Sequence, residues 1–207
     1  MRVVKASLLL LGWLLCAASP PLRAQTTDDR PVILAVGEST TEGYGVPRDQ
    51  SYPAQLQRLL DAAGYDYRVV NHGKSGSTTA QALTSLDRGV ALLPKIVLIA
   101  IGGNDSGNSV AAERTERNLR KLVMMFVRTG SKVYLADRTE GSDGAASSLY
   151  ATIAREEGAT LMPSLREGIA GNPDLLISDM RHPNAAGYTI IANRIFTMLQ
   201  PDLVKPQ

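Results

Sequence analysis

The sequence has few of the side chains that most often hold metals or disulfides: its 207 residues include one cysteine and two histidines. The cysteine, Cys16, lies inside an apolar stretch near the start of the chain. One cysteine excludes an internal disulfide framework, so the fold must be held together by its core. Two histidines without further thiols leave little for a metal cluster. We therefore expect neither a disulfide nor a bound metal.

Three motifs of common enzyme classes are also missing. The pattern Gly-x-Ser-x-Gly occurs nowhere, which argues against the nucleophile elbow of an α/β-hydrolase. The stretch Gly73-Lys74-Ser75 lacks the glycine that a phosphate-binding loop needs five residues earlier, where Arg68 stands. No Gly-x-Gly-x-x-Gly follows the first strand, as a dinucleotide-binding fold requires.

Residues 1–24 have the three-part layout of a secretory signal peptide. Arg2 and Lys5 give a basic start, an apolar stretch follows over 6–18, and Ala24 suits the position before a cleavage site. The apolar stretch is shorter than the ~20 residues that span a bilayer, which favours cleavage over an uncleaved anchor. The sequence thus predicts export, to a periplasm or out of the cell, with no membrane span after cleavage.

Charge of one sign is not in excess once this segment is set aside. The chain has 22 Lys and Arg and 20 Asp and Glu. Arg2, Lys5 and Arg23 lie in the leader, so the remainder would carry 19 basic and 20 acidic side chains. This balance gives no indication of a nucleic-acid partner. We expect a short exposed lead-in over 25–30 and one domain over 31–203, long enough for a full-sized core.

The rest of the chain alternates between the apolar periodicities of strands and of helices. We expect strands at 31–36, 67–70, 95–101, 132–136 and 160–162, and helices at 52–63, 79–92, 110–129, 145–157 and after Pro183. Such alternation implies right-handed crossovers and an α/β fold, with a parallel sheet covered on both faces. The Gly/Ser-rich stretch 140–148 is interpreted as a mobile loop at the rim of the sheet.

Polar blocks follow the first three strands and precede the last helix. They are Gly37-Glu38-Ser39-Thr40, Ser75-Gly76-Ser77-Thr78, Gly102-Gly103-Asn104-Asp105 and Asp179-Met180-Arg181-His182-Pro183. The carboxyl ends of parallel strands meet at one edge of a sheet, so these blocks should converge there. Serine needs a base to become a nucleophile, histidine suits that task, and a carboxylate can orient the imidazole. A glycine N–H and an asparagine amide can stabilise an oxyanion.

The four blocks together resemble those of the SGNH hydrolases, also called GDSL lipases/esterases, and within them the thioesterase I/lysophospholipase and arylesterase branch. The resemblance implies a three-layer α/β/α flavodoxin-like fold with a five-stranded parallel sheet, no cofactor, and hydrolysis of small acyl esters through an acyl-serine. It would make Ser39 the nucleophile, His182 the base and Asp179 its orienting carboxylate. The Ser39 N–H, the Gly76 N–H and the Asn104 side chain would form the oxyanion hole.

The chain departs from the family pattern beside the serine, where Glu38 and Thr40 replace aspartate and leucine. Glutamate keeps the charge but is one methylene longer, so the hydrogen bonds that brace the neighbouring loops should shift. These two changes leave open a non-catalytic binding protein on the same scaffold. A carbohydrate O-acetylesterase also stays open, because the same blocks serve the removal of acetyl groups from sugars. The resemblance sets no oligomeric state.

Three other side chains near the blocks have simpler interpretations. His72 is interpreted as a loop residue near the cleft and not as the base. Tyr44 and Tyr188 are interpreted as packing residues and not as substrate contacts.

Overall fold

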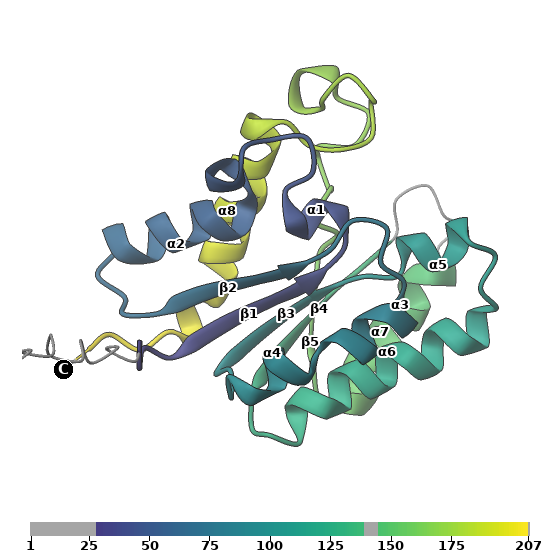
Figure 1. Ribbon diagram of the computed structural model, residues 1–207, viewed down its shortest axis with the longest axis horizontal. Helices are drawn as coiled ribbons and strands as arrows, with labels where there is room; N and C mark the ends of the chain where they lie inside the picture. The colour runs from purple at the N-terminus through teal and green to yellow at the C-terminus, as the bar shows by residue number, and fades with distance from the viewer. Residues whose placement is uncertain (1–27, 139–144, 207) are drawn as a thin grey trace, which may run out of the picture.

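A computed structural model describes residues 28–138 and 145–206, and they form three layers with a parallel sheet in the middle (Figure 1). The strands are β1 (Val32–Gly37), β2 (Arg68–Gly73), β3 (Ile96–Ala100), β4 (Lys132–Ala136) and β5 (Thr160–Met162). Their order is β2-β1-β3-β4-β5, and every neighbouring pair is parallel. This is the flavodoxin-like order. The predicted α/β fold with a five-stranded parallel sheet is confirmed.

Helices cover both faces of the sheet (Figure 1). They are α1 (Ser39–Glu42), α2 (Tyr52–Ala62), α3 (Thr79–Ser85), α4 (Asp87–Ala91), α5 (Gly103–Gly107), α6 (Ala112–Val127), α7 (Ala145–Glu157) and α8 (Ala185–Leu199), with short 3-10 turns at Arg48–Gln50, Pro173–Leu175 and Gln200–Asp202. Helices α2 and α8 pack on one face, and α3, α6 and α7 pack on the other.

Each face of the sheet has its own core, because successive strand residues point to opposite sides. Ile33 and Leu98 face α2 and α8, where they belong to a cluster with Leu56 and Tyr188. Their neighbours in the strands, such as Leu34, belong to the cluster on the opposite face. Every residue of β1 and β3 is buried, which explains why these strands are continuous apolar runs in the sequence.

The second strand is longer than the sequence predicted. It was expected over 67–70, but β2 continues to Gly73 because its backbone pairs in register with β1 as far as Gly37. The loop assignment of His72 is therefore wrong, and this residue pairs with Val36 inside the sheet.

The helix expected over 79–92 is two helices, α3 and α4, separated at Leu86. The Leu86 side chain is fully buried in the core under the sheet, and Gly89 approaches both Leu86 and Leu34 closely. The turn brings a second short segment onto the same core. Of the stretch expected as a loop over 140–148, residues from Ala145 on belong to α7, and 139–144 lie outside the described residues.

The predicted signal peptide over 1–24 also lies outside the described residues. In the parts that are described, no helix has the length and apolar character needed to cross a bilayer.

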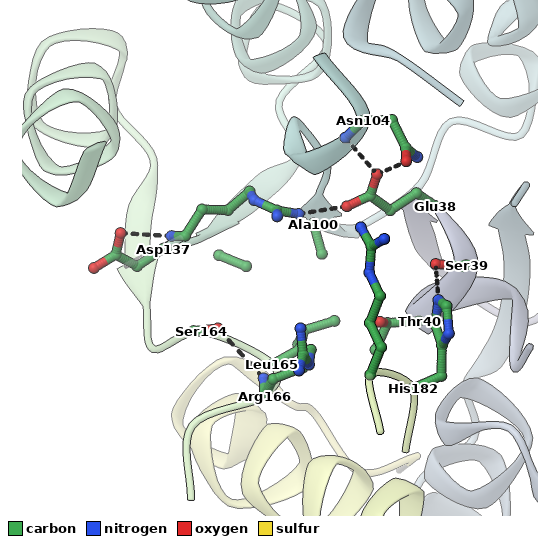
Figure 2. Close-up of a pocket in the computed structure, with 13 residues that line it drawn as sticks. Glu38, Ser39, Thr40, Ala100, Asn104, Asp137, Ser164, Leu165, Arg166 and His182 are labelled. Carbon is green, nitrogen blue, oxygen red and sulfur yellow. Dashed lines mark hydrogen bonds and ion pairs between the residues drawn. The ribbon is translucent and has the colours of Figure 1, made fainter. Parts of the chain in front are cut away.

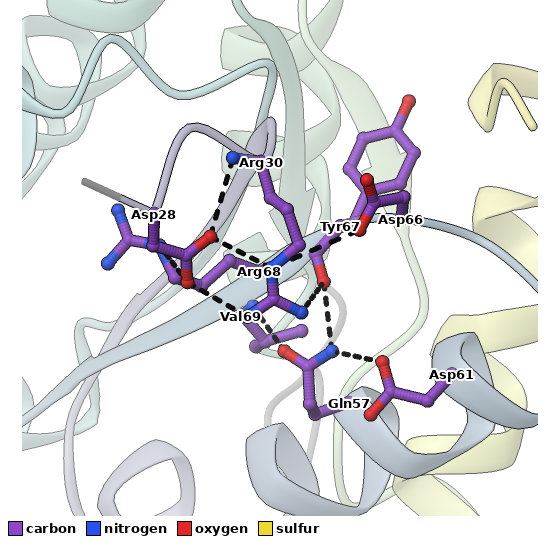
Figure 3. A network of polar contacts seen from close by, with 8 residues as sticks. All are labelled: Asp28, Arg30, Gln57, Asp61, Asp66, Tyr67, Arg68 and Val69. Atoms are coloured by element: carbon purple, nitrogen blue, oxygen red, sulfur yellow. Dashed lines mark hydrogen bonds and ion pairs between the residues drawn. The ribbon is translucent and has the colours of Figure 1, made fainter. Parts of the chain in front are cut away.

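A polar network fixes the segment before β1 to the start of β2 and to α2 (Figure 3). Arg30 pairs with Asp28 at 2.8 Å, and Arg68 lies 3.5 Å from the same carboxylate. The hydrogen bond from Arg30 lowers the pKa of Asp28 to about 2. Gln57 in α2 donates to the carbonyl of Tyr67 at 2.9 Å. The network lies at the amino ends of the strands, opposite the end at which the polar blocks meet.

Candidate active site

Ser39 stands at the carboxyl end of β1, where two glycines make room for α1. A Cβ at Gly37 would collide with Thr41 and come within 2.7 Å of the Ala100 carbonyl. A Cβ at Gly73, which pairs with Gly37 across the sheet, would collide with the α1 backbone. Helix α1 can therefore begin directly at the sheet edge, and its first residue, Ser39, faces the pocket.

The structure brings Ser39, His182 and Asp179 into one chain of hydrogen bonds. His182 Nε2 lies 2.8 Å from Ser39 Oγ (Figure 2). His182 Nδ1 lies 2.6 Å from Asp179 Oδ2. A carboxylate on Nδ1 favours the tautomer in which Nδ1 carries the proton, which leaves Nε2 free to accept the serine proton.

The loop that carries Asp179 and His182 is fixed by hydrogen bonds to its own backbone. Asp179 Oδ1 accepts the N–H groups of Arg181 and His182, both at 2.9 Å. The His182 carbonyl accepts the N–H of Ile177 at 2.9 Å. The His182 side-chain hydrogen bond is the largest cause that lowers the pKa of Asp179 to about 2, followed by the backbone N–H donors. Asp179 is therefore ionised at neutral and mildly acidic pH.

The last helix begins immediately after this loop. Asn184 is its N-cap, and its side-chain oxygen accepts the N–H of Gly187 at 3.1 Å. The cap satisfies one of the N–H groups that a helix start leaves without a helical acceptor. It also fixes the position of His182 relative to α8.

Two tyrosines adjoin the loop, and they differ in how far they are buried. Tyr188 is fully buried, as expected for a packing residue, and its hydroxyl donates to the Tyr44 carbonyl at 3.1 Å. Tyr44 keeps 48% of its surface exposed, and its ring lies against His182 with centroids 4.6 Å apart. Tyr44 therefore lies at the surface beside the imidazole and not in the core.

Asn104 reaches the same edge from the start of α5. Its Nδ2 donates to Glu38 Oε2 at 2.5 Å (Figure 2). The same nitrogen donates to the Ser77 carbonyl at 3.0 Å. Its backbone N–H donates to the same Glu38 oxygen at 3.2 Å. Both amide hydrogens of Asn104 thus have acceptors within the protein. Glu38 is one methylene longer than the aspartate of the family pattern, and its carboxylate contacts the segment that carries Asn104.

Asp105, the neighbour of Asn104, anchors α5 through buried hydrogen bonds. Asp105 is 1% exposed, and its carboxylate accepts the Thr79 N–H at 2.8 Å and the Thr79 hydroxyl at 2.5 Å. Buried carboxylates are tolerated where charge-assisted hydrogen bonds satisfy them. Asp105 thereby ties α5 to the start of α3.

Gly76 lies between Ser75, which donates to Glu42, and Ser77, whose carbonyl accepts Asn104. Its φ of 77° lies in the left-handed region. Among the described residues, the lining of the pocket at Ser39 does not include Gly76. The oxyanion role of Gly76 stays a prediction.

The pocket beside Ser39 encloses about 50 Å³ and is polar on most sides. Its apolar lining comes from Ala100, Ala136 and Leu165. Its lining also includes three arginines that the sequence analysis missed, namely Arg138, Arg166 and Arg181. Two of them follow strands β4 and β5, so the rule that polar groups at strand ends converge could have found them.

The second histidine lies outside this pocket, near the end of β2. His72 Nε2 lies 3.4 Å from Ser85 Oγ, and neither residue lines the pocket at Ser39. His72 and Ser85 thus form a second pair of serine and histidine, and within the described residues neither side chain hydrogen-bonds to a carboxylate. Over residues 28–138 and 145–206, no group of three or more His, Cys, Asp or Glu side chains is arranged to hold a metal.

The chain is similar to known proteins over most of its length. Residues 35–190 match the GDSL-like Lipase/Acylhydrolase family. The chain is 32% identical to Esterase TesA of Pseudomonas aeruginosa, over 82% of this chain and 88% of that protein. It is 29% identical to Thioesterase 1/protease 1/lysophospholipase L1 of Escherichia coli, over 82% of this chain and 83% of that protein.

A solved structure also matches this fold. The crystal structure of the psychrotrophic esterase EstA from Pseudoalteromonas sp., inhibited by monoethylphosphonate, superposes with a TM-score of 0.76. It is 26% identical and covers 82% of this chain and 97% of its own. With the family match spanning most of the described residues and esterases among the relatives, the chain belongs to the GDSL-like lipase/acylhydrolase family, the SGNH hydrolases, and is an ester hydrolase.

Proposed function

We propose that this protein hydrolyses short acyl esters through an acyl-serine, with Ser39 as the nucleophile. The hydrogen-bond chain from Ser39 Oγ to His182 Nε2, at 2.8 Å, and from His182 Nδ1 to Asp179, at 2.6 Å, carries this proposal. A base within hydrogen-bond reach of a hydroxyl, itself oriented by a carboxylate, is the arrangement that activates serine.

In this mechanism His182 Nε2 takes the Ser39 proton while Oγ bonds to the ester carbonyl carbon. The carbonyl oxygen becomes an oxyanion in the tetrahedral intermediate. His182 then gives its proton to the departing alkoxide, and the acyl group remains on Ser39. A water molecule, deprotonated by the same nitrogen, hydrolyses the acyl-serine and restores the enzyme. The Asp179 carboxylate stabilises the imidazolium in both steps.

The oxyanion would be held by the N–H groups of Ser39 and Gly76 and by the Asn104 amide. Ser39 is the first residue of α1, and the first N–H groups of a helix have no acceptor within it. Asn104 can act only if an amide hydrogen now donated to Glu38 or Ser77 is shared with the substrate. The Glu38 contact is therefore part of the proposed mechanism.

The pocket supports a short acyl group. At about 50 Å³ it has room for only a few water molecules, at about 10–15 Å³ each. This size and the polar lining favour acetyl or similarly short acyl groups, so a carbohydrate O-acetylesterase is the second candidate. Export by cleavage after Ala24 is part of the same proposal, and acetylated polysaccharides would then be accessible substrates.

The test is hydrolysis of p-nitrophenyl esters from acetyl to palmitoyl by protein beginning at Gln25, with acetylated xylan in a parallel assay. We expect highest activity on the shortest esters and loss of activity in Ser39→Ala. Ser85→Ala is the matched control, because it removes the other histidine-bonded serine, and it should behave as wild type. A serine-directed phosphonate should label wild type and not Ser39→Ala. A folded protein that neither hydrolyses nor labels would instead support the non-catalytic binding protein.

A further inference from the structure

A carboxylate lies directly behind the proposed oxyanion donor. Glu38 is 8% exposed, and its Oε2 accepts from the side chain and the backbone of Asn104. During catalysis a second negative charge would form on the substrate oxygen and compete for the same amide. Two negative charges at one donor repel each other, and the repulsion is strong where water is excluded. An uncompensated Glu38 would therefore oppose the reaction.

Arg138 supplies the compensating charge. It follows β4, and its Nη1 donates to Glu38 Oε1, the carboxylate oxygen that does not contact Asn104. Glu38 follows β1 and Asn104 follows β3, so three neighbouring strand ends carry this network. The side chains of Arg138 and Glu38 are 34% and 10% exposed, so the pair is screened less than a surface pair.

The Arg138 guanidinium packs against Gly103, in the space that a side chain at this position would occupy. A Cβ at Gly103 would collide with the guanidinium carbon and with both of its terminal nitrogens. The φ of Gly103 is not positive, so the backbone conformation itself does not require glycine. Glycine at this position therefore provides the space that Arg138 occupies next to Asn104.

We propose that Arg138 is a positioning residue for ester hydrolysis, which neutralises Glu38 so that the Asn104 amide can stabilise the oxyanion. The proposal rests on the proposed roles of Ser39 and Asn104. Without Arg138, Glu38 would hold the amide more strongly and would repel the oxyanion. Both effects act on the transition state more than on the bound ester, so kcat should fall while KM changes little.

The first experiment measures kcat and KM of Arg138→Met and Arg138→Lys on p-nitrophenyl acetate. We expect Arg138→Met to lose about tenfold or more in kcat with KM within about threefold, and the lysine variant to recover part of the loss. Arg120→Met is the matched control. Arg120 pairs with Glu116, Glu156 and Glu157 on α6 and α7, and none of these residues lines the pocket. It should keep wild-type kcat.

Two further variants separate positioning from a structural role. Gly103→Ala displaces the guanidinium of Arg138 but keeps its charge in the chain, so kcat should fall in this variant too. If Arg138→Met does not fold, Gly103→Ala and Arg138→Lys decide the test. In a Glu38→Gln background, Arg138→Met should cause little further loss, because no charge remains to be neutralised. A folded Arg138→Met with wild-type kcat, or a loss that is undiminished in the Glu38→Gln background, overturns the proposal. Ser39→Ala with wild-type activity would instead overturn the proposed function itself.

Discussion

The ring of Tyr44 lies against the imidazole of His182, with centroids 4.6 Å apart and planes inclined at 47°. The contact covers part of one side of the imidazole. An aromatic neighbour limits the rotation of a ring that must face Ser39 and Asp179 at once. The position of the His182 ring is therefore set by packing as well as by hydrogen bonds.

Tyr44→Ala should lower kcat several-fold, because the imidazole loses the contact that restricts its rotation. Tyr44→Phe keeps the ring and should retain wild-type kcat, since the tyrosine bonds to Tyr188 through its carbonyl and not through its hydroxyl. Steady-state kinetics on p-nitrophenyl acetate check this prediction. Equal activity of all three proteins would show that the hydrogen bonds alone position His182.

Asn104→Ala should reduce kcat by about 10²-fold, a loss of ~3 kcal/mol of transition-state stabilisation, if its amide is an oxyanion donor. The substitution also removes the hydrogen bonds to Glu38 and Ser77, so stability must be measured separately by thermal unfolding. A folded variant with wild-type kcat would show that the amide serves only to hold the two loops together.

Asp179→Asn should reduce kcat by about 10³ to 10⁴-fold, because an amide permits the imidazole tautomer that cannot accept the serine proton. Measurement of kcat by rapid mixing with an activated ester covers this range. Asp174→Asn, an exposed carboxylate that lies earlier in the same connection, should have wild-type activity. Substantial activity in Asp179→Asn would mean that backbone contacts alone orient His182.

The same substitution should alter how stability depends on pH. Hydrogen bonds from the His182 side chain and backbone lower the pKa of Asp179 from the usual 3.8 to about 2, so the ionised carboxylate stabilises the folded state. This stabilisation is complete above the unfolded pKa and is lost as the pH falls towards 2. Wild type should therefore unfold at higher urea than Asp179→Asn at pH 6, and the difference should shrink between pH 4 and 2. A difference that grows on acidification would contradict this assignment.

Asp105→Ala should lower the free energy of unfolding by about 2–3 kcal/mol, because it leaves the buried Thr79 N–H without its charged acceptor. Urea denaturation measures the loss. The matched control is Asp29→Ala, whose carboxylate is exposed ahead of β1 and should change stability little. Equal stability of both variants would exclude Asp105 as an anchor of α5.

The parts of the fold with a local physical cause were predictable from the sequence. Strand β1 is buried on both faces, so it is one apolar run that ends at Gly37. Ser39 and His182 stand out because a serine nucleophile needs a histidine base, and Ser39 follows β1 while His182 precedes the last helix. The end of β2 was missed because it depends on pairing with β1, which no local pattern records.

Arg138 was missed for a similar reason. Its partner, Glu38, lies 100 residues earlier in the chain, and an arginine after a strand has no distinctive local pattern. The sequence did identify Glu38 as a departure from the family. The partner of the Glu38 carboxylate becomes evident only when the ends of β1, β3 and β4 are placed side by side.

The paired glycines at the ends of β1 and β2 bear on protein engineering. Gly37 and Gly73 pair across the sheet, and side chains at either would collide with α1. Suppose that Ser39, Asp179 and His182 were transplanted onto another sheet of the same strand order with larger residues at these two positions. The helix that carries the serine could then not pack against the sheet edge. The two glycines would have to be transplanted with these three residues, although neither glycine lines the pocket at Ser39.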